Sequence, residues 1–207
     1  MPEPLVKLDR VSKQFRSATE RRQVLGDISL SIQSGDRISL IGPNGSGKTT
    51  LLRLLLGLES PDHGTVATDD LTPGTVAYVP QDYRNGLFPW LTLRQNLLLP
   101  FSEAGRPPDG QVFAQYDSLS RSFKISLSLD KFPYQLSGGE QQIFSLLRAL
   151  VMRPVLLVVD ELLSAVDFAR KLVILDHLAH WLSTSSVTFV AASHDFDEAV
   201  LLADRVC

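Results

Sequence analysis

The sequence predicts an α/β fold: a mainly parallel sheet, an antiparallel β subdomain at the N-terminus and an inserted α-helical subdomain. Two short apolar runs, residues 155–159 and 187–192, are typical of parallel strands that are buried on both faces. In the segment 4–33, apolar and polar side chains alternate near its end, as in an antiparallel strand with one solvated face. Residues 82–134 contain two helix-like segments separated by a Pro/Gly-rich break. Together these patterns predict the three parts of the fold.

We expect residues 1–207 to form a single domain. Residues 1–81 and 154–207 would form the core with its antiparallel β subdomain, and residues 82–153 the helical subdomain. A chain of 207 residues with 44% hydrophobic and 21% charged residues is long enough, and apolar enough, to bury a core of this kind.

The composition also limits the kinds of partner and the cellular compartment that we expect for this chain. The net charge is −3 and the sequence has no run of Lys or Arg, so we expect no nucleic-acid partner. The single cysteine, Cys207, excludes a disulfide framework and favours a reducing, cytoplasmic setting. No uncharged apolar run approaches the ~18–20 residues of a membrane-spanning helix, so any membrane role would depend on a partner.

The N-terminal segment is expected to be an antiparallel hairpin. Ile28, Leu30 and Ile32 alternate with polar residues, residues 17–22 are polar enough for a hairpin loop, and residues 34–36 form a turn. Phe15 stands just before the loop. Its pattern is compatible with a core residue at a strand end or with an aromatic platform for a nucleobase.

A glycine-rich stretch between two apolar runs predicts a strand, a phosphate-binding turn and a helix. Backbone N–H groups of such a turn form an anion nest, and the following helix adds the positive end of its dipole. Lys48 can reach the outer phosphates of a nucleotide, and the Thr49 hydroxyl can ligate Mg²⁺. An ordinary Gly-rich turn would not need the Lys-Thr pair, so we expect a P-loop NTPase core that binds a nucleoside triphosphate through Gly42, Pro43, Asn44, Gly45, Ser46, Gly47, Lys48, Thr49 and Thr50.

Further helices and a strand follow the phosphate loop. Residues 51–58 are apolar nearly all round, which predicts a buried helix that Gly57, Pro61 and Gly64 bring to an end. Residues 75–80 form a short strand, and Gln81 lies just past its end. The inserted subdomain would contain helices over residues 92–99 and 112–123.

A long helix is expected from about residue 137 to Met152. Ser137 and Glu140 form a capping box, which is a sufficient structural reason for both residues. The capping box does not explain Gly138 and Gly139, because glycine in the first turn costs helix stability. Their missing side chains would let a second anion approach the helix N-terminus.

Two acidic residues, Asp160 and Glu161, follow the apolar strand 155–159. In open α/β sheets ligands bind beyond the carboxyl ends of the strands, and the phosphate loop lies at the same edge. Asp160 suits the ligand shell of Mg²⁺, and Glu161 suits the orientation or deprotonation of an attacking water. The structural alternative is that either acid caps the next helix.

The last part of the chain predicts an amphipathic helix after Asp167, with Leu172 among its apolar residues, and a third buried strand over residues 187–192. That strand delivers His194 to the ligand edge of the sheet, where its role is either structural or to sense a phosphate. Asp195 and Glu198 then resemble a second capping box.

Taken together, these motifs resemble those of the ATP-binding subunits of ABC transporters, and the resemblance covers nearly the whole chain. Residues 42–49 are similar to the Walker A loop, residues 155–160 to the Walker B strand, and residues 136–141 to the family signature Leu-Ser-Gly-Gly-x-Gln. The resemblance implies roles for five further positions: a catalytic base (Glu161), the Q-loop glutamine (Gln81), the D-loop aspartate (Asp167), the switch histidine (His194) and the adenine-stacking aromatic (Phe15).

In this family two ATPase domains pair head to tail, and the resemblance implies a homodimer of this kind. Each ATP would lie between the Walker A loop of one protomer and the signature helix of the other, at Ser137, Gly138, Gly139 and Gln141. ATP and Mg²⁺ would be the cofactors, with Thr49, Gln81 and Asp160 around the metal.

Residues 81–92 resemble the importer branch, close to the nitrate, sulfonate and taurine type. The resemblance implies that this segment receives a coupling helix of a transmembrane permease subunit, at the cytoplasmic face of the membrane, with a solute-binding protein as an indirect partner. The structural alternative is that Phe88 and Trp90 form the core of the helical subdomain.

The sequence departs from the family pattern at Leu162, Val166 and Ile143, where a proline, a leucine and an arginine are usual, and it stops at Cys207 where relatives continue. Two other functions stay open: a soluble, non-transport ABC ATPase in DNA repair, translation or cofactor assembly, and a non-hydrolysing, ATP-binding regulatory subunit. The single domain without a coiled-coil insertion argues against the first, and the full set of catalytic residues against the second.

Overall fold

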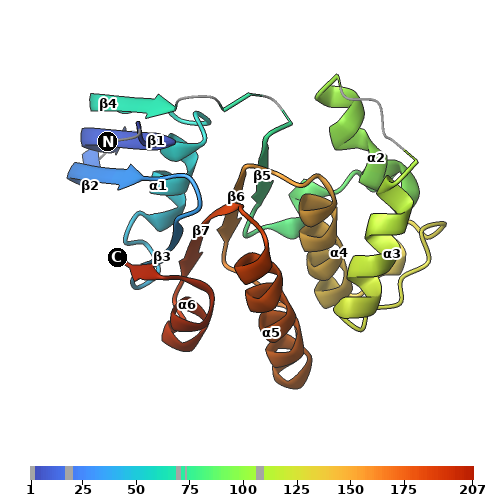
Figure 1. Cartoon of the computed structure of the whole chain (residues 1–207). Helices are drawn as coiled ribbons and strands as arrows, with labels where there is room; N and C mark the ends of the chain where they lie inside the picture. The colour runs from blue at the N-terminus through green and yellow to red at the C-terminus, as the bar shows by residue number, and fades with distance from the viewer. Residues whose placement is uncertain (1–2, 17–20, 69–70, 73, 106–109) are drawn as a thin grey trace.

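The computed structural model describes residues 3–16, 21–68, 71–72, 74–105 and 110–207. A five-stranded sheet, in which all the strand pairs are parallel, occupies the centre of the molecule, with strand order β5-β6-β7-β3-β8 (Figure 1). The predicted parallel sheet is therefore confirmed. Its strands are β3 (Arg37–Ile41), β5 (Val76–Val79), β6 (Leu156–Asp160), β7 (Thr188–Ser193) and β8 (Arg205–Val206).

A second, antiparallel sheet has the order β2-β1-β4 and consists of β1 (Val6–Arg16), β2 (Arg21–Ile32) and β4 (His63–Thr68). The expected hairpin forms, but β2 already begins at Arg21, so that end of the predicted 17–22 loop is wrong; residues 17–20 lie outside the described part. Strand β4 was not predicted, because the sequence pattern indicates only that Gly64 helps to end the preceding helix. Gly64 instead has φ +82°, and a Cβ there would overlap the Arg10 carbonyl.

Most of the helices that the sequence predicts are present in the structure. Helix α1 (Lys48–Leu55) follows β3, but Leu58, predicted to be buried, is 61% exposed because the helix has ended three residues earlier. The inserted segment contains the 3₁₀ turns η1 (Tyr83–Gly86) and η2 (Pro133–Gln135) with the helices α2 (Leu93–Glu103), α3 (Val112–Ser122) and α4 (Gly138–Val151). These helices gather on the side of the molecule away from the antiparallel sheet (Figure 1). Helices α5 (Phe168–Thr184) and α6 (Phe196–Leu202) precede and follow β7 in the sequence. Leu172 of α5, predicted to be apolar core, is half exposed.

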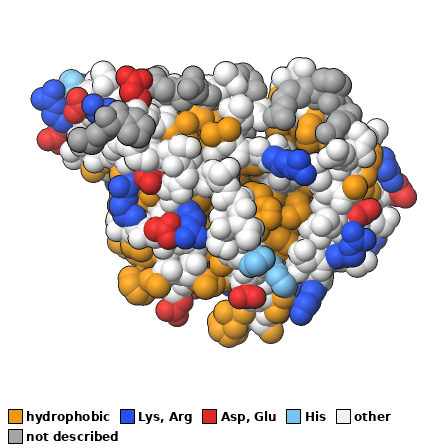
Figure 2. All heavy atoms as spheres, in the orientation of Figure 1, with side chains coloured by type: hydrophobic (Ala, Val, Ile, Leu, Met, Phe, Trp, Pro, Cys, Tyr) orange, Lys and Arg blue, Asp and Glu red, His pale blue; other side chains and the backbone are white. Residues whose placement is uncertain are grey.

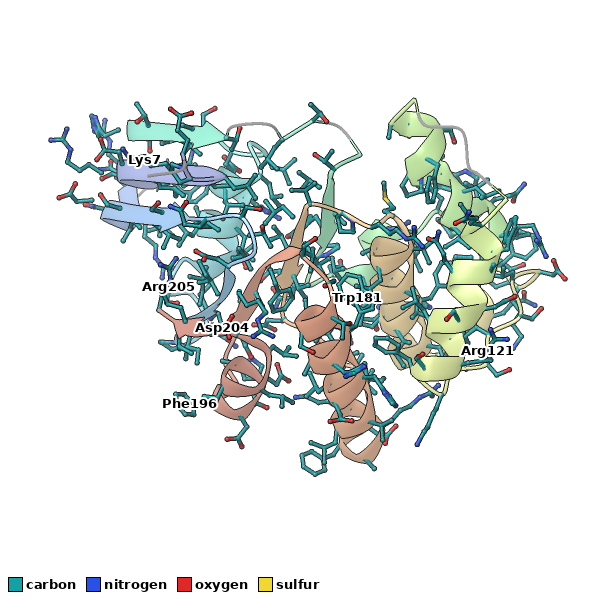
Figure 3. The ribbon with its side chains drawn as sticks, in the orientation of Figure 1. Lys7, Arg121, Trp181, Phe196, Asp204 and Arg205 are labelled. Atoms are coloured by element: carbon teal, nitrogen blue, oxygen red, sulfur yellow. The ribbon has the colours of Figure 1, made fainter. Side chains whose placement is uncertain are left out.

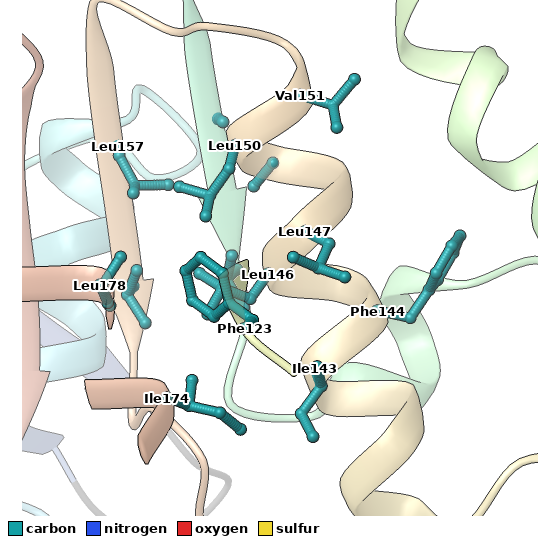
Figure 4. Packing of buried hydrophobic residues seen from close by; sticks show 14 of the residues in the cluster. Phe123, Ile143, Phe144, Leu146, Leu147, Leu150, Val151, Leu157, Ile174 and Leu178 are labelled. Atoms are coloured by element: carbon teal, nitrogen blue, oxygen red, sulfur yellow. The ribbon is translucent and has the colours of Figure 1, made fainter. Parts of the chain in front are cut away.

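Two clusters of buried side chains form the core. The larger cluster runs without a break from the inserted helices to the parallel sheet: Ile143 and Leu150 of α4 share it with Leu157 of β6 and Leu178 of α5 (Figure 4). The smaller cluster fills the space between the two sheets and α1. The inserted helices are thus packed onto the sheet through common apolar contacts.

An ion pair and a hydrogen bond at the surface hold β8 and the residue before it in place. The Arg37 guanidinium donates to both carboxylate oxygens of Asp204 at 2.8 and 2.6 Å, and Arg205 Nη2 donates to the Ser31 carbonyl of the antiparallel sheet at 2.8 Å. Figure 3 labels Asp204 and Arg205 at this end of the sheet. Acidic and basic side chains are interspersed on the face shown in Figure 2. None of the helices in the described ranges is long and apolar enough to cross a bilayer.

Candidate active site

Three loops meet at one edge of the parallel sheet because β3, β6 and β7 are parallel neighbours and end at the same level. The register pairs Ile41 of β3 with Ser193 of β7, and Asp160 of β6 with Ala192 of β7. The phosphate loop after β3, the acidic pair after β6 and His194 after β7 therefore come together, as the sequence predicts.

The phosphate loop borders a cleft of about 350 Å³. Lys48 Nζ donates to the carbonyl oxygens of Gly42 at 2.7 Å and Pro43 at 3.2 Å, which holds the ammonium over the loop. Gly47 has φ +99°, and a Cβ there would lie 2.9 Å from the Val24 carbonyl, so only glycine fits between α1 and β2. The cleft is lined by Arg22, Val24, Asn44, Gly45, Gly47, Lys48, Thr49, Thr50, Gln81 and Glu161.

Asp160 is 1% exposed, and its Oδ2 atom has no hydrogen-bond partner among the described residues. Burial raises the pKa of this carboxyl group, while a hydrogen bond with Thr49 acts in the opposite direction. A buried, unpaired carboxylate oxygen is costly unless a cation compensates it. Thr49, Gln81 and Asp160 line one hollow of about 380 Å³, and their oxygen atoms are of the kind that Mg²⁺ prefers, so these residues fit the metal.

The Glu161 carboxylate lies between two of the other predicted site residues. Gln81 Nε2 donates to Glu161 Oε2 at 2.8 Å, and His194 Nδ1 lies 3.7 Å from Glu161 Oε1. The backbone turns sharply here, with φ +56° at Glu161. Neither acid of the pair caps the next helix, because α5 takes its N-cap from Asp167, whose side chain accepts from the Arg170 N–H. The capping alternative for Asp160 and Glu161 is therefore wrong.

The N-terminus of α4 has the predicted capping box. The Glu140 N–H donates to Ser137 Oγ at 3.3 Å, and the Ser137 N–H donates to Glu140 Oε2 at 2.8 Å. The hydrogen bond from the Ser137 backbone is the largest cause of the lowered pKa of Glu140. Gln141 turns back, with Nε2 donating to the Leu136 carbonyl at 3.2 Å.

Gly138 and Gly139 have a structural reason that the sequence did not reveal. A Cβ on Gly138 would overlap the Tyr83 hydroxyl of η1, and one on Gly139 would lie 2.9 Å from the Ala165 carbonyl oxygen. Both glycines thus let other loops of the same chain pack closely against the helix N-terminus.

Gln142 is a site residue that sequence reasoning missed. Its buried side chain donates to the Glu161 carbonyl and to Ser164 Oγ, each at 3.3 Å, and its Oε1 accepts from the Ala165 N–H at 2.9 Å. Gln142 therefore ties α4 to the loop that carries Glu161. The only signal was a polar residue at an inward position of an amphipathic helix. Ile143, the next residue, is fully buried in the larger core cluster.

Several surface predictions can now be compared with the structure. Phe15 is 42% exposed at the end of β1, so its core interpretation is wrong. Phe88 is 40% exposed and Trp90 69% exposed, and their ring centroids lie 5.3 Å apart in an edge-on arrangement, so the alternative that these two residues form the core of the helical subdomain is wrong. Asp195 caps α6, but the Glu198 side chain turns to Ser193 Oγ and Lys171 Nζ rather than back to the helix start, so the second capping box is wrong.

The comparisons with known proteins agree on one protein family. Residues 25–164 match the protein family described as "ABC transporter". The chain is 39% identical over 206 residues to an aliphatic sulfonates import ATP-binding protein, SsuB 1, of Pseudomonas savastanoi pv. phaseolicola, covering 100% of this chain and 81% of that protein. It is 36% identical over 209 residues to the spermidine/putrescine import ATP-binding protein PotA of Chromobacterium violaceum, covering 98% of this chain and 56% of that protein. The chain thus spans about half the length of the spermidine/putrescine relatives that it matches.

Solved structures agree with the fold. A dimeric, post-hydrolysis state of the ATP-binding cassette MJ0796 bound to ADP and Pi superimposes with a TM-score of 0.84 at 28% identity, covering 97% of this chain and 92% of that chain. The P-loop NTPase fold predicted from the sequence is therefore confirmed.

Proposed function

The chain belongs to the ABC transporter family, and we propose that it binds Mg·ATP and hydrolyses it to drive import through a membrane permease. The observation that carries this proposal is the Glu161 carboxylate, which Gln81 holds at 2.8 Å on the wall of the cleft that Lys48 and Thr49 also line. A phosphate-binding loop alone would explain nucleotide binding. A general base at the same cleft supports hydrolysis.

In the proposed reaction, Lys48 and the N–H groups of the loop hold the phosphates. Glu161 accepts a proton from the water whose oxygen attacks the γ-phosphorus, and the bond to the ADP oxygen breaks. His194, beside Glu161, steadies the γ-phosphate. Thr49, Gln81 and Asp160 would hold Mg²⁺, which neutralises phosphate charge when it is bound.

We further propose a head-to-tail homodimer in which Ser137, Gly138, Gly139 and Gln141 meet the nucleotide of the partner; the dimeric state of the MJ0796 cassette supports this arrangement. A transmembrane permease subunit would dock at residues 81–92, where Phe88 and Trp90 are exposed, at the cytoplasmic face of the membrane. A solute-binding protein would be an indirect partner. The sulfonate-import relative supports a small anion, such as a sulfonate, taurine or nitrate, as the solute.

The test is to purify the tagged chain from gently solubilised membranes, to identify what accompanies it, and to assay ATP hydrolysis. We expect a polytopic membrane subunit whose presence stimulates hydrolysis. Recovery of only soluble partners or nucleic acid would overturn the transport proposal in favour of a soluble ATPase. Absence of hydrolysis in a single-turnover assay with bound ATP would instead favour the regulatory subunit.

A further inference from the structure

Strand β2 runs directly beside the phosphate loop. A Cβ on Gly47 would lie 2.9 Å both from the Val24 carbonyl and from Leu25 Cδ2, which leaves no gap between strand and loop. Side chains alternate along a strand, so residues two apart share a face. Arg22 and Val24 both line the nucleotide cleft, whereas Gln23 turns the other way, toward Gly26.

The Arg22 side chain reaches the phosphate loop itself. Its Nη2 atom would lie 3.7 Å from a Cβ on Gly45, so the guanidinium covers this part of the loop. Lys48 also lines the cleft, and its ammonium is bound to loop carbonyls. Arg22 is solvent-exposed and thus adds a second cation to the same cleft from a different sheet.

The register of the hairpin indicates which part of a bound nucleotide would pass Arg22. Arg22 is paired with Phe15 across β1 and β2, and Phe15 is the exposed aromatic ring that would stack on the base. Arg22 thus stands between the position of the base and the loop that holds the phosphates. A guanidinium presents paired N–H donors that match phosphate oxygens and keeps its charge at any physiological pH.

From this geometry we propose that Arg22 is a further nucleotide-binding residue that contacts the phosphate chain of the nucleotide held by the phosphate loop. The inference rests on the proposed ATP binding and adds a residue to that site. Because the contact is with charge rather than with the base, Arg22 contributes to affinity for ATP and ADP but not for adenosine.

The experiment compares Arg22→Gln, Arg22→Lys and Arg21→Gln with the wild-type protein. Arg21 is the matched control, because it is the preceding exposed arginine of the same strand and is not among the residues that line the cleft. Dissociation constants for ATP, ADP and adenosine are measured by displacement of a fluorescent ATP analogue, in EDTA to prevent turnover, at low and at high KCl. Circular dichroism melting checks that each variant folds.

For Arg22→Gln we expect about fivefold weaker binding of ATP and ADP, the upper range for a solvent-exposed ion pair. Adenosine affinity stays unchanged, and the loss of ATP affinity shrinks at high salt. Arg22→Lys recovers most of the affinity, and Arg21→Gln binds as the wild type does. Equal ATP affinity in Arg22→Gln and the wild type, or an equal loss for adenosine, would overturn the role of Arg22 alone. A wild-type protein that does not bind ATP would overturn the proposed function instead.

Discussion

The contact between Tyr83 and Gly138 predicts a measurable coupling between two loops of the site. Replacing Gly138 by alanine in the first turn of α4 would gain up to about 1 kcal/mol of helix propensity. The new Cβ would, however, overlap the Tyr83 hydroxyl, and overpacking of this kind costs about 1–3 kcal/mol. Gly138→Ala alone should therefore lose up to about 2 kcal/mol of unfolding free energy.

Tyr83→Phe should remove the conflict. Without the hydroxyl oxygen, the nearest Tyr83 atom to the Gly138 Cβ is the ring carbon Cζ at 3.4 Å, at the margin of ordinary van der Waals contact. In the Tyr83→Phe background Gly138→Ala should then stabilise the protein by up to about 1 kcal/mol, giving a coupling of about 1–3 kcal/mol.

The assay is urea denaturation of the four proteins in the cycle, without nucleotide and at low concentration. Under these conditions no partner phosphate is present, so only contacts within the chain contribute. Additive effects of the two substitutions would refute the packing argument. In that case the absence of side chains at Gly138 and Gly139 would be explained only by the approach of an anion bound to the partner protomer.

Three more outcomes follow from the site. Glu161→Gln should lower ATP turnover at least about 100-fold while ATP still binds and traps a dimer; normal turnover in a coupled assay would remove Glu161 as the base. Lys48→Ala should weaken ATP binding by about tenfold or more in calorimetry, and an unchanged affinity would contradict the loop assignment. Burial raises the pKa of Asp160, so its ionisation destabilises the metal-free fold as pH rises through that pKa. Asp160→Asn should therefore be more stable than the wild type at pH 7, with the difference vanishing below about pH 4; a difference independent of pH would contradict this reasoning.

The parts of the molecule with strong local signals could be predicted from the sequence. The apolar run 155–159 and the capping pair Ser137–Glu140 are each complete within a few residues, so both signals are local, although the strand itself begins at Leu156 and Val155 is 41% exposed. Strand β4 could not be predicted, because its only reason to form is an edge of β1 more than fifty residues away in the sequence. The sequence pattern indicates that Gly64 helps to end a helix. In the structure its positive φ instead lets β4 pass close to the Arg10 carbonyl.

The same distinction applies to the candidate site. Residues 42–50 carry the sequence pattern of a phosphate-binding loop. Asp160, Glu161 and His194 lie at the carboxyl ends of parallel strands, which meet at one edge of the sheet. Arg22 and Gln142 carry no such pattern, since an arginine in a hairpin and a glutamine in a helix are common everywhere. Only the approach of β2 to the phosphate loop, and of α4 to the loop after β6, brings them to the site.

The unbroken cluster that joins α4 to β6 and α5 makes the inserted helices inseparable from the sheet. A helical segment swapped in from a relative would meet a foreign apolar surface on α5 and would need that surface replaced with it. For the same reason the amides of α4 and β6 should become exchangeable with solvent deuterium together, as one cooperative unit. We therefore expect the inserted helices to move during turnover by a short sliding of α4 over its neighbours, because a wide hinge opening would expose the cluster to water.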